Sequence, residues 1–257
     1  MARPYRPGMT SSTGPNAPRL PLLDDSGFTR VLCVVAHPDD MEYGASAAVA
    51  KWTERGVDVR YLLATRGEAG IDGMAPDVAG PLREQEEIDG ARIVGVEVVE
   101  FLDHRDGVVE YGLPLRRDIA RAIRRHRPDV VVSGSHAERF VGGMTNQADH
   151  RAVGLAALDA CKDAGNRWIF PELVEEGHEP WSGVKQLLSM ASSSPTHGID
   201  VTGYVDAAVA SLRAHGAYLD GLGEGWPPPE EFLPMMAAGG GAMLGVDAGL
   251  VVEVYDL

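Results

Sequence analysis

The chain carries an uncharged run, residues 31–36, that ends abruptly in the polar sequence His37-Pro38-Asp39-Asp40. Three of the six residues in the run are valines, a composition typical of a strand buried on both faces of a parallel sheet. Pro38 cannot donate a ladder hydrogen bond, so the strand must turn there. Ligand sites in open α/β sheets lie beyond the carboxyl ends of strands. The sequence therefore predicts that the polar residues of this turn lie where such folds place their chemistry.

Apolar runs and helical patterns alternate along the rest of the chain. The expected strands are 30–36, 57–65, 96–102, 129–133, 185–191 and 249–255. The expected helices are 42–55, 82–94, 115–127, 150–164 and 204–220. Long loops are expected at 66–81 and 136–149, and a loop or arm rich in proline and glycine at 224–241. This alternation predicts an α/β fold with a Rossmann-like, mostly parallel, doubly wound sheet. No GxGxxG or Walker fingerprint is present, so a nucleotide cofactor is not indicated.

The length of 257 residues is compatible with one large α/β domain, which we expect at residues 27–257. Residues 1–26 are rich in Pro, Gly and Ser and have little periodicity, so they are predicted to form a mobile N-terminal arm. The two cysteines, Cys33 and Cys161, fall in a predicted strand and a predicted helix. We expect both to be small buried hydrophobes, with no disulfide framework.

The charge balance bears on the class of partner. The chain has 23 Lys and Arg against 38 Asp and Glu, a formal charge of -15, whereas nucleic-acid surfaces need clustered Lys and Arg. No run reaches transmembrane length, and the N-terminus lacks the apolar stretch of a signal peptide. We therefore expect no nucleic-acid partner and no membrane insertion, and the lack of a disulfide framework makes a cytoplasmic protein the default. A homo-oligomer stays possible.

Metal-capable side chains recur at Asp149-His150, where a long loop ends and a helix is expected to begin. The first and fourth strands can be neighbours in a doubly wound sheet, which would bring His37, Asp40 and His150 together. Three such ligands and an open position for water are the pattern of a catalytic zinc site. Asp39, beside the ligands, could then take a proton from the water. The alternative is that both aspartates cap the following helix and His37 is an ordinary strand-end residue.

Several motifs in a fixed order then resemble the LmbE-like, or PIG-L-like, N-deacetylases: His37-Pro38-Asp39-Asp40, Thr65-Arg-Gly67-Glu68-x-Gly70, Arg83-x-x-Glu86, Asp106-Gly107 and Asp149-His150. The resemblance covers residues 31–160, with a weaker echo at 199–202 and 212–215. It implies a Rossmann-like fold, one divalent metal, usually Zn²⁺, and hydrolysis of an N-acetyl group on a small-molecule substrate, often an N-acetylglucosamine conjugate. It also implies the site residues: metal ligands His37, Asp40 and His150; general base Asp39; and substrate or near-site residues Glu68, Arg83 and Asp106.

One position departs from the family pattern. Members frequently carry a histidine three positions before the second metal histidine, where this chain has Gln147. A glutamine amide can donate a hydrogen bond but carries no positive charge, so Gln147 is the expected, weaker oxyanion donor unless His136 of the same loop takes its place. Two alternatives follow: hydrolysis of another amide or ester on a secondary metabolite, and a metal-binding member with weakened catalysis. Arg83 and Glu86 could also be a mere surface pair, and His215 is expected to serve helix packing.

Overall fold

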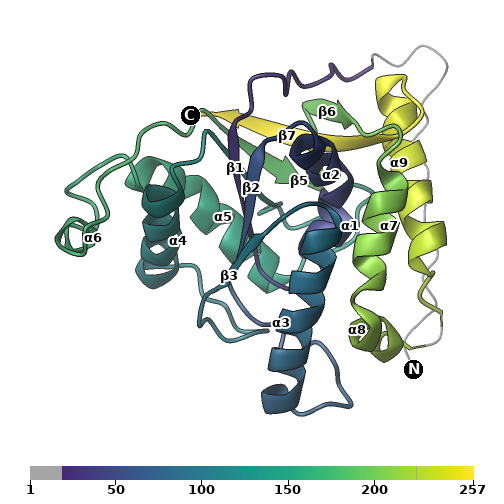
Figure 1. Ribbon diagram of the computed structural model, residues 1–257, viewed down its shortest axis with the longest axis horizontal. Helices are drawn as coiled ribbons and strands as arrows, with labels where there is room; N and C mark the ends of the chain where they lie inside the picture. The colour runs from purple at the N-terminus through teal and green to yellow at the C-terminus, as the bar shows by residue number, and fades with distance from the viewer. Residues whose placement is uncertain (1–18, 224) are drawn as a thin grey trace.

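The computed structural model describes residues 19–223 and 225–257, and within them seven strands form one sheet (Figure 1). The strand order is β3-β2-β1-β4-β5-β7-β6. The strands are β1 Arg30–Val35, β2 Asp58–Leu63, β3 Val98–Phe101, β4 Val130–Gly134, β5 Gln186–Met190, β6 His197–Asp200 and β7 Gly249–Asp256. Strands β1 to β5 are parallel, and β7 runs antiparallel to both β5 and β6. The predicted mostly parallel α/β sheet is confirmed.

Helices cover both faces of this sheet, as Figure 1 shows. Alternate residues of β1 explain the two layers, because Val31, Cys33 and Val35 belong to one buried cluster and Leu32 and Val34 to the other. Helices α1, α2, α3, α7 and α9 cover the first face, and α4 and α5 cover the second. The helices are α1 Asp40–Gly44, α2 Ser46–Glu54, α3 Pro76–Ile93, α4 Leu113–His126, α5 Ala148–Asp163, α6 Glu172–Glu175, α7 Val205–Arg213, α8 Gly216–Gly221 and α9 Pro229–Leu244.

The strand order reverses between β1 and β4, which places a topological switch point at the centre of the sheet. The connections leaving these two parallel strands go to opposite sides, so a crevice opens beyond their carboxyl ends. The turn 36–39 follows β1, and the loop 135–147 follows β4 and leads into α5. The fold therefore brings together the two stretches that the sequence singled out for metal binding.

Several element boundaries differ from the prediction. Helix α3 begins at Pro76 rather than at residue 82, because Pro76 occupies the first turn, where a missing N–H costs nothing, and Pro81 is accommodated inside the helix. The helix expected at 42–55 is divided at Ala45, and the one expected at 204–220 is divided at His215. The short edge strand β6 was not predicted, since four residues give too little periodicity to be read as a strand.

The prediction of a loop or arm at 224–241 was wrong for most of its length, because α9 runs from Pro229 to Leu244. Pro229 stands in the first turn of this helix, so the prolines permit its start. A side chain at Gly240 or Gly241 would collide with backbone at the start of β7 or just before it. Packing against β7 thus outweighs the low helix propensity of the glycine run.

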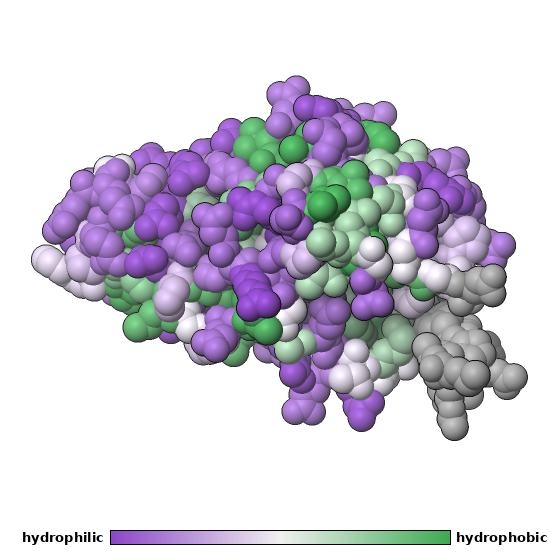
Figure 2. Space-filling model, turned by 90° about the horizontal axis from the view of Figure 1, so that it is seen from below, coloured by the Kyte–Doolittle hydropathy of each residue, from purple (hydrophilic) through white to green (hydrophobic). Residues whose placement is uncertain are grey.

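The predicted N-terminal arm falls largely in residues 1–18, outside the described part of the chain. From Arg19 onward the chain lies against the domain: Leu23 N–H donates to Gly198 O at 2.7 Å, and Asp25 pairs with Lys51 and Arg55. Cys33 and Cys161 are both buried free thiols. In the described residues no helix is both long and apolar enough to span a bilayer. The face in Figure 2 is mostly hydrophilic, with separate hydrophobic areas between.

Helix α5 approaches β4 closely at Gly154, where an added Cβ would collide with the carbonyl oxygen of Gly134. We expect Gly154→Ala to lower the free energy of unfolding by about 1–3 kcal/mol, the usual cost of overpacking. Urea unfolding measures this change. The matched control is Gly134→Ala, because a Cβ there has no atom within 4 Å. Equal midpoints for the two variants would contradict the close approach.

Candidate metal centre

Three side chains from the turn after β1, from α1 and from α5 converge at the switch point. His37 Nδ1 lies 3.1 Å from His150 Nε2, and His150 Nε2 lies 3.0 Å from Asp40 Oδ1. Asp40 Oδ2 is 3.8 Å from His37 Nδ1 and accepts the backbone N–H groups of Ala36 and His37, each at 2.9 Å. The carboxylate is thus fixed by the turn itself. The predicted trio of His37, Asp40 and His150 is brought together within metal-binding range.

The outer side of the His37 ring determines which nitrogen faces this point. Nε2 lies 3.0 Å from Asp106 Oδ1 and 3.4 Å from Asp149 Oδ2, and carboxylates only accept hydrogen bonds. In the neutral imidazole the proton therefore sits on Nε2, which leaves the Nδ1 lone pair directed at His150. Asp149 is held in turn by the N–H groups of Gly107 and Val109, at 2.7 and 3.1 Å.

Asn146 sets the tautomer of His150 in the same way. Its amide nitrogen donates to Ser135 O and Ala137 O, at 2.6 and 2.9 Å, so its oxygen must be the atom that faces His150 Nδ1 at 3.1 Å. His150 Nδ1 therefore carries the proton and Nε2 presents a lone pair. Outer hydrogen bonds of this kind typically orient metal-ligating histidines. Two neutral imidazole nitrogens and a carboxylate that face one another form a donor set that fits a divalent metal.

The electrostatics of the site also favour positive charge. Burial by itself would lower the pKa of His37, yet Asp106, Asp149 and Asp40 raise it well above its ordinary value. Burial likewise acts against the charge of His150, and Asp40 nevertheless raises the pKa of that ring. Burial would raise the pKa of Asp40, but the adjacent His150 and His37 hold it well below its ordinary value. The carboxylates thus create a place where a cation is stabilised.

Asp39 is buried beside the trio but is turned to other partners. Its backbone has a φ of 101°, a left-handed conformation that is unusual outside glycine, and its side chain makes no helix-capping hydrogen bond. The capping alternative is therefore wrong for Asp39. Its N–H donates to Glu87 Oε2 at 3.1 Å, and its carboxylate bonds Arg83 at 2.7 Å and also Tyr218. Burial raises the pKa of the Asp39 carboxyl, and the Arg83 charge offsets part of the effect.

Arg83 lies beneath the site with only 2% of its surface exposed. Its guanidinium donates to Asp39, to Pro38 O and, at 3.0 Å, to Gly67 O, and it stacks on the ring of Tyr218. A side chain at Gly67 would collide with this guanidinium, so the glycine in the Thr65-Arg-Gly67-Glu68 motif makes room for it. These contacts exclude a mere surface pair with Glu86, which is itself buried and accepts Ala217 N–H at 2.6 Å.

Glu68 and Asp106 join the loop after β2 to the loop after β3. Glu68 Oε1 accepts the N–H of Asp106 at 2.9 Å, and Asp106 Oδ2 accepts the N–H of Ala69 at 2.8 Å. The remaining oxygen of Asp106 is the one that holds His37. The structure thus places Glu68 and Asp106, two of the predicted substrate or near-site residues, in contacts that support the metal centre, and Asp106 directly contacts a candidate ligand.

The two candidates of the loop after β4 lie apart from these contacts. Gln147 is exposed at the N-cap of α5, one turn before His150, and its side chain makes no capping hydrogen bond. The ring of His136 packs against Tyr255, with 5.9 Å between centroids. Phe140 is the loop residue whose ring lies against His150, also at 5.9 Å.

Three residues of the site were not singled out from the sequence: Asn146, Glu87 and Tyr218. Asp149 was predicted only as a metal-capable neighbour of His150, whereas in the structure its carboxylate orients the ring of His37. A signal existed for Asn146 and Asp149, since both stand beside His150 in the chain and a ligating histidine needs an acceptor for its second nitrogen. Tyr218 and Glu87 gave no comparable signal. Their positions depend on how α8 and α3 pack against the turn after β1.

Comparisons with known proteins identify a family and several relatives of this chain. The family model described as PIG-L, GlcNAc-PI de-N-acetylase, matches residues 32–161, which are 130 of the 257 residues. A diacetylchitobiose deacetylase of Thermococcus kodakarensis is 29% identical over 202 residues, covering 77% of this chain and 74% of the relative. A 1D-myo-inositol 2-acetamido-2-deoxy-alpha-D-glucopyranoside deacetylase of Kineococcus radiotolerans is 28% identical over 250 residues, covering 72% and 68%.

A solved structure shares the fold. The N,N'-diacetylchitobiose deacetylase from Pyrococcus horikoshii superposes with a TM-score of 0.80 at 23% identity, covering 90% of this chain and 85% of that one. The family match begins in β1 and ends in α5, so it spans the elements that carry His37, Asp40 and His150. With its sheet, its ordered motifs and its family match in agreement, this chain belongs to the PIG-L, or LmbE-like, deacetylase family.

Proposed function

We propose that this protein hydrolyses the N-acetyl group of an N-acetylglucosamine-type conjugate or a related small metabolite, with one Zn²⁺ bound by His37, Asp40 and His150. The observation that carries the proposal is the convergence of two imidazole nitrogens and a carboxylate, beside a second, buried carboxylate, Asp39, that Arg83 holds in place. The relatives named above are deacetylases of N-acetylated sugars, and they support the substrate class.

The residues of the chain have separate tasks in this reaction. A divalent metal in the site would polarise the amide carbonyl and acidify the attacking water. Asp39 accepts the proton of that water and later returns it to the leaving amine, a task favoured by the raised pKa of its carboxyl. Arg83 and Tyr218 hold the Asp39 carboxylate in place. Gln147 is the proposed neutral donor to the oxyanion, and Glu68, Arg83, Asp106 and His136 remain the candidates for contact with substrate.

The test of this function is acetate release from a panel of N-acetyl compounds, run with metal-free and zinc-reconstituted protein. We expect release only with zinc. In His37→Ala and in His150→Ala we expect both bound metal and acetate release to fall, because each variant removes one of three ligands. His178→Ala, which changes a histidine that belongs to no candidate metal group of the described residues, is the control and should keep both. Unchanged metal content in the first two variants would rule out the proposed ligand set.

A second candidate is hydrolysis of another amide or ester on a secondary metabolite. The observation in its favour is the apolar character of the loop after β4, where Phe140 lies against His150 and Met144 is exposed. Such a loop suits a substrate with a large apolar substituent. Including N-acyl and ester compounds with apolar groups in the panel separates the two candidates.

Gln147 provides a prediction of its own. We expect Gln147→His to raise turnover on a simple N-acetyl sugar, because a charged donor forms an oxyanion hydrogen bond about twice as strong as a neutral donor does. The pH–rate profile should also gain a titration near the histidine pKa, about 6.5. If His136 already fills this role, His136→Ala should be nearly inactive and Gln147→His should change little. If both variants match the parent, position 147 lies outside the reacting centre.

A further inference from the structure

A second group of metal-capable side chains lies in the interior behind the turn that carries Asp39. Glu42 of α1, Glu87 of α3 and His215 between α7 and α8 place one ligand atom each within 4.8 Å of one another. All three residues are at most 1% exposed. We call this group the inner triad. It shares no residue with the trio of His37, Asp40 and His150.

The inner triad is short of hydrogen-bond partners. In the described residues nine buried side-chain N and O atoms have no partner, and four of them belong to the triad: Glu42 Oε2, Glu87 Oε1, and His215 Nδ1 and Nε2. Burying polar atoms without partners is costly, and burying an uncompensated carboxylate costs far more. The concentration of such atoms at one point therefore indicates a missing ligand, not a random packing defect.

The distances distinguish an ion from direct hydrogen bonding. His215 Nε2 lies 3.6 Å from Glu42 Oε2 and 3.8 Å from Glu87 Oε2. Both separations exceed the range of a hydrogen bond, 2.7–3.2 Å for N–H···O. Two ligands of one tetrahedral cation with bonds of about 2.0–2.2 Å stand about 3.3–3.6 Å apart, close to the observed spacing.

We propose that the inner triad is a second, structural metal site, in which Glu42, Glu87 and His215 bind a divalent cation of the zinc class. Two carboxylates and one imidazole are ordinary ligands of such an ion, and their two negative charges balance it. The imidazole is neutral and offers a lone pair, because burial, together with the nearby charge of Arg83, lowers the pKa of His215 to about 3. The proposal concerns a donor set separate from the deacetylase centre and does not depend on that function.

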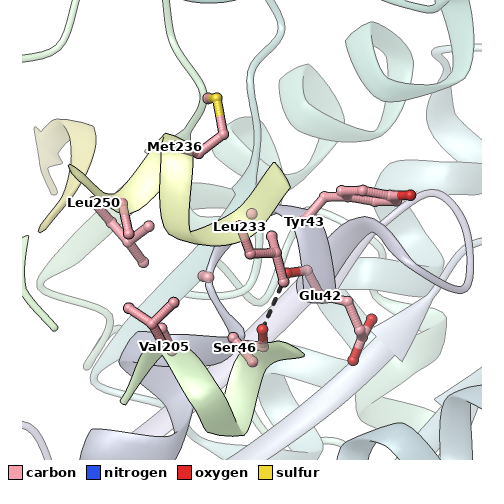
Figure 3. Close-up of a pocket in the computed structure, with 12 residues that line it drawn as sticks. Glu42, Tyr43, Ser46, Val205, Leu233, Met236 and Leu250 are labelled. Atoms are coloured by element: carbon pink, nitrogen blue, oxygen red, sulfur yellow. Dashed lines mark hydrogen bonds between the residues drawn. The ribbon is translucent and has the colours of Figure 1, made fainter. Parts of the chain in front are cut away.

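The surrounding chain leaves room for the ion and holds the ligands. Gly90, one turn after Glu87, has no side chain, and an added Cβ would lie 3.1 Å from His215 Nε2. Ser211 donates to the other oxygen of Glu42 at 2.9 Å, which leaves Oε2 for the ion. Figure 3 shows that the Glu42 carboxylate points away from Leu233 and the other apolar residues of the nearby pocket. The carboxylate therefore faces the protein interior and not this pocket.

An ion at this position would cross-link several elements behind the candidate metal centre. Glu87 Oε2 also accepts the N–H of Asp39, so one side chain joins the inner triad to the left-handed turn of the proposed base. The same ion would tie α1, α3 and the α7–α8 junction to one point. The site is sealed from solvent, which is typical of a structural ion bound during folding.

The test is metal analysis of the full-length chain produced and purified with zinc, together with anomalous diffraction at the zinc edge. We expect two zinc ions per chain and an anomalous peak between Glu42, Glu87 and His215. One zinc per chain, with no peak at the inner triad, would overturn the proposal. In that case protons on the carboxyl groups, and not a metal ion, neutralise the inner triad. This measurement needs only the parent protein and no variant.

Variants assign each ion to its site. We expect Glu87→Gln, which keeps an acceptor for Asp39 N–H, to remove one zinc, and His150→Ala to remove the other. Glu42→Gln provides a second test of the inner triad. Glu86→Gln is the matched control, because Glu86 is the buried neighbour of Glu87 and lies outside the triad, so it should retain two. Two ions that both persist in Glu87→Gln and Glu42→Gln would overturn the assignment, whatever the result for acetate release.

Discussion

Acetate release by Asp39→Asn should fall by about 10²–10⁴-fold while bound metal stays at the level of the parent. That range is the usual contribution of a general base, and an amide cannot accept the proton of water. The variant should keep the local backbone, because asparagine tolerates the left-handed conformation that position 39 adopts, with φ at 101°. The expected loss therefore lies in kcat, with little change in KM.

The measurement compares steady-state acetate release with zinc content in the same preparations. Asp103→Asn is the matched control, because the Asp103 carboxylate is 92% exposed and pairs with the half-buried Arg66. It should retain the activity and metal of the parent. Full activity in Asp39→Asn would assign the base to another residue, whereas parallel loss of zinc would mean that Asp39 helps to bind the metal.

The central part of the fold could be predicted from the sequence because its signals are local. The uncharged run before His37, the valines of β4 and the helical spacing between them depend only on near neighbours in the chain. Helix α9 could not be predicted in this way. Its prolines and glycines argue against a helix until β7 is in place, and only then does the close packing at Gly240 become an advantage.

The same distinction between local and long-range signals applies to the candidate site. His37, Asp40 and His150 could be identified from ligand chemistry and from the positions of strand ends. Their orientation could not. The ring of His37 is oriented by Asp106, which comes from the loop after β3, and the ring of His150 by Asn146, whose amide is set by the fold of its own loop. For Arg83 the motif predicted a contact with substrate, while the structure shows a buried guanidinium whose contacts are with the turn after β1, with Gly67 and with Tyr218.

Because Arg83 is buried and also holds Asp39, its substitution should affect both the stability of the fold and catalysis. We expect Arg83→Met to lower the free energy of unfolding by about 3–5 kcal/mol, the usual cost of removing one partner from a buried ion pair. Asp39 would keep a buried carboxylate without its cation, and the carbonyl groups of Pro38 and Gly67 would lose their donor. Urea unfolding measures the loss, with equal slopes required for the comparison.

The control for Arg83→Met is Arg213→Met, which removes an arginine from a pair with Glu230 in which both side chains are 50% exposed. Water screens that pair, so the unfolding midpoint should stay close to that of the parent. Because Arg83 positions Asp39, Arg83→Met should also lower kcat more than it raises KM for any active substrate. A large rise in KM with kcat unchanged would instead make Arg83 a substrate-binding residue, the role that the family resemblance gives it. Equal midpoints for the two arginine variants would show that the buried pair adds nothing to the stability of the fold.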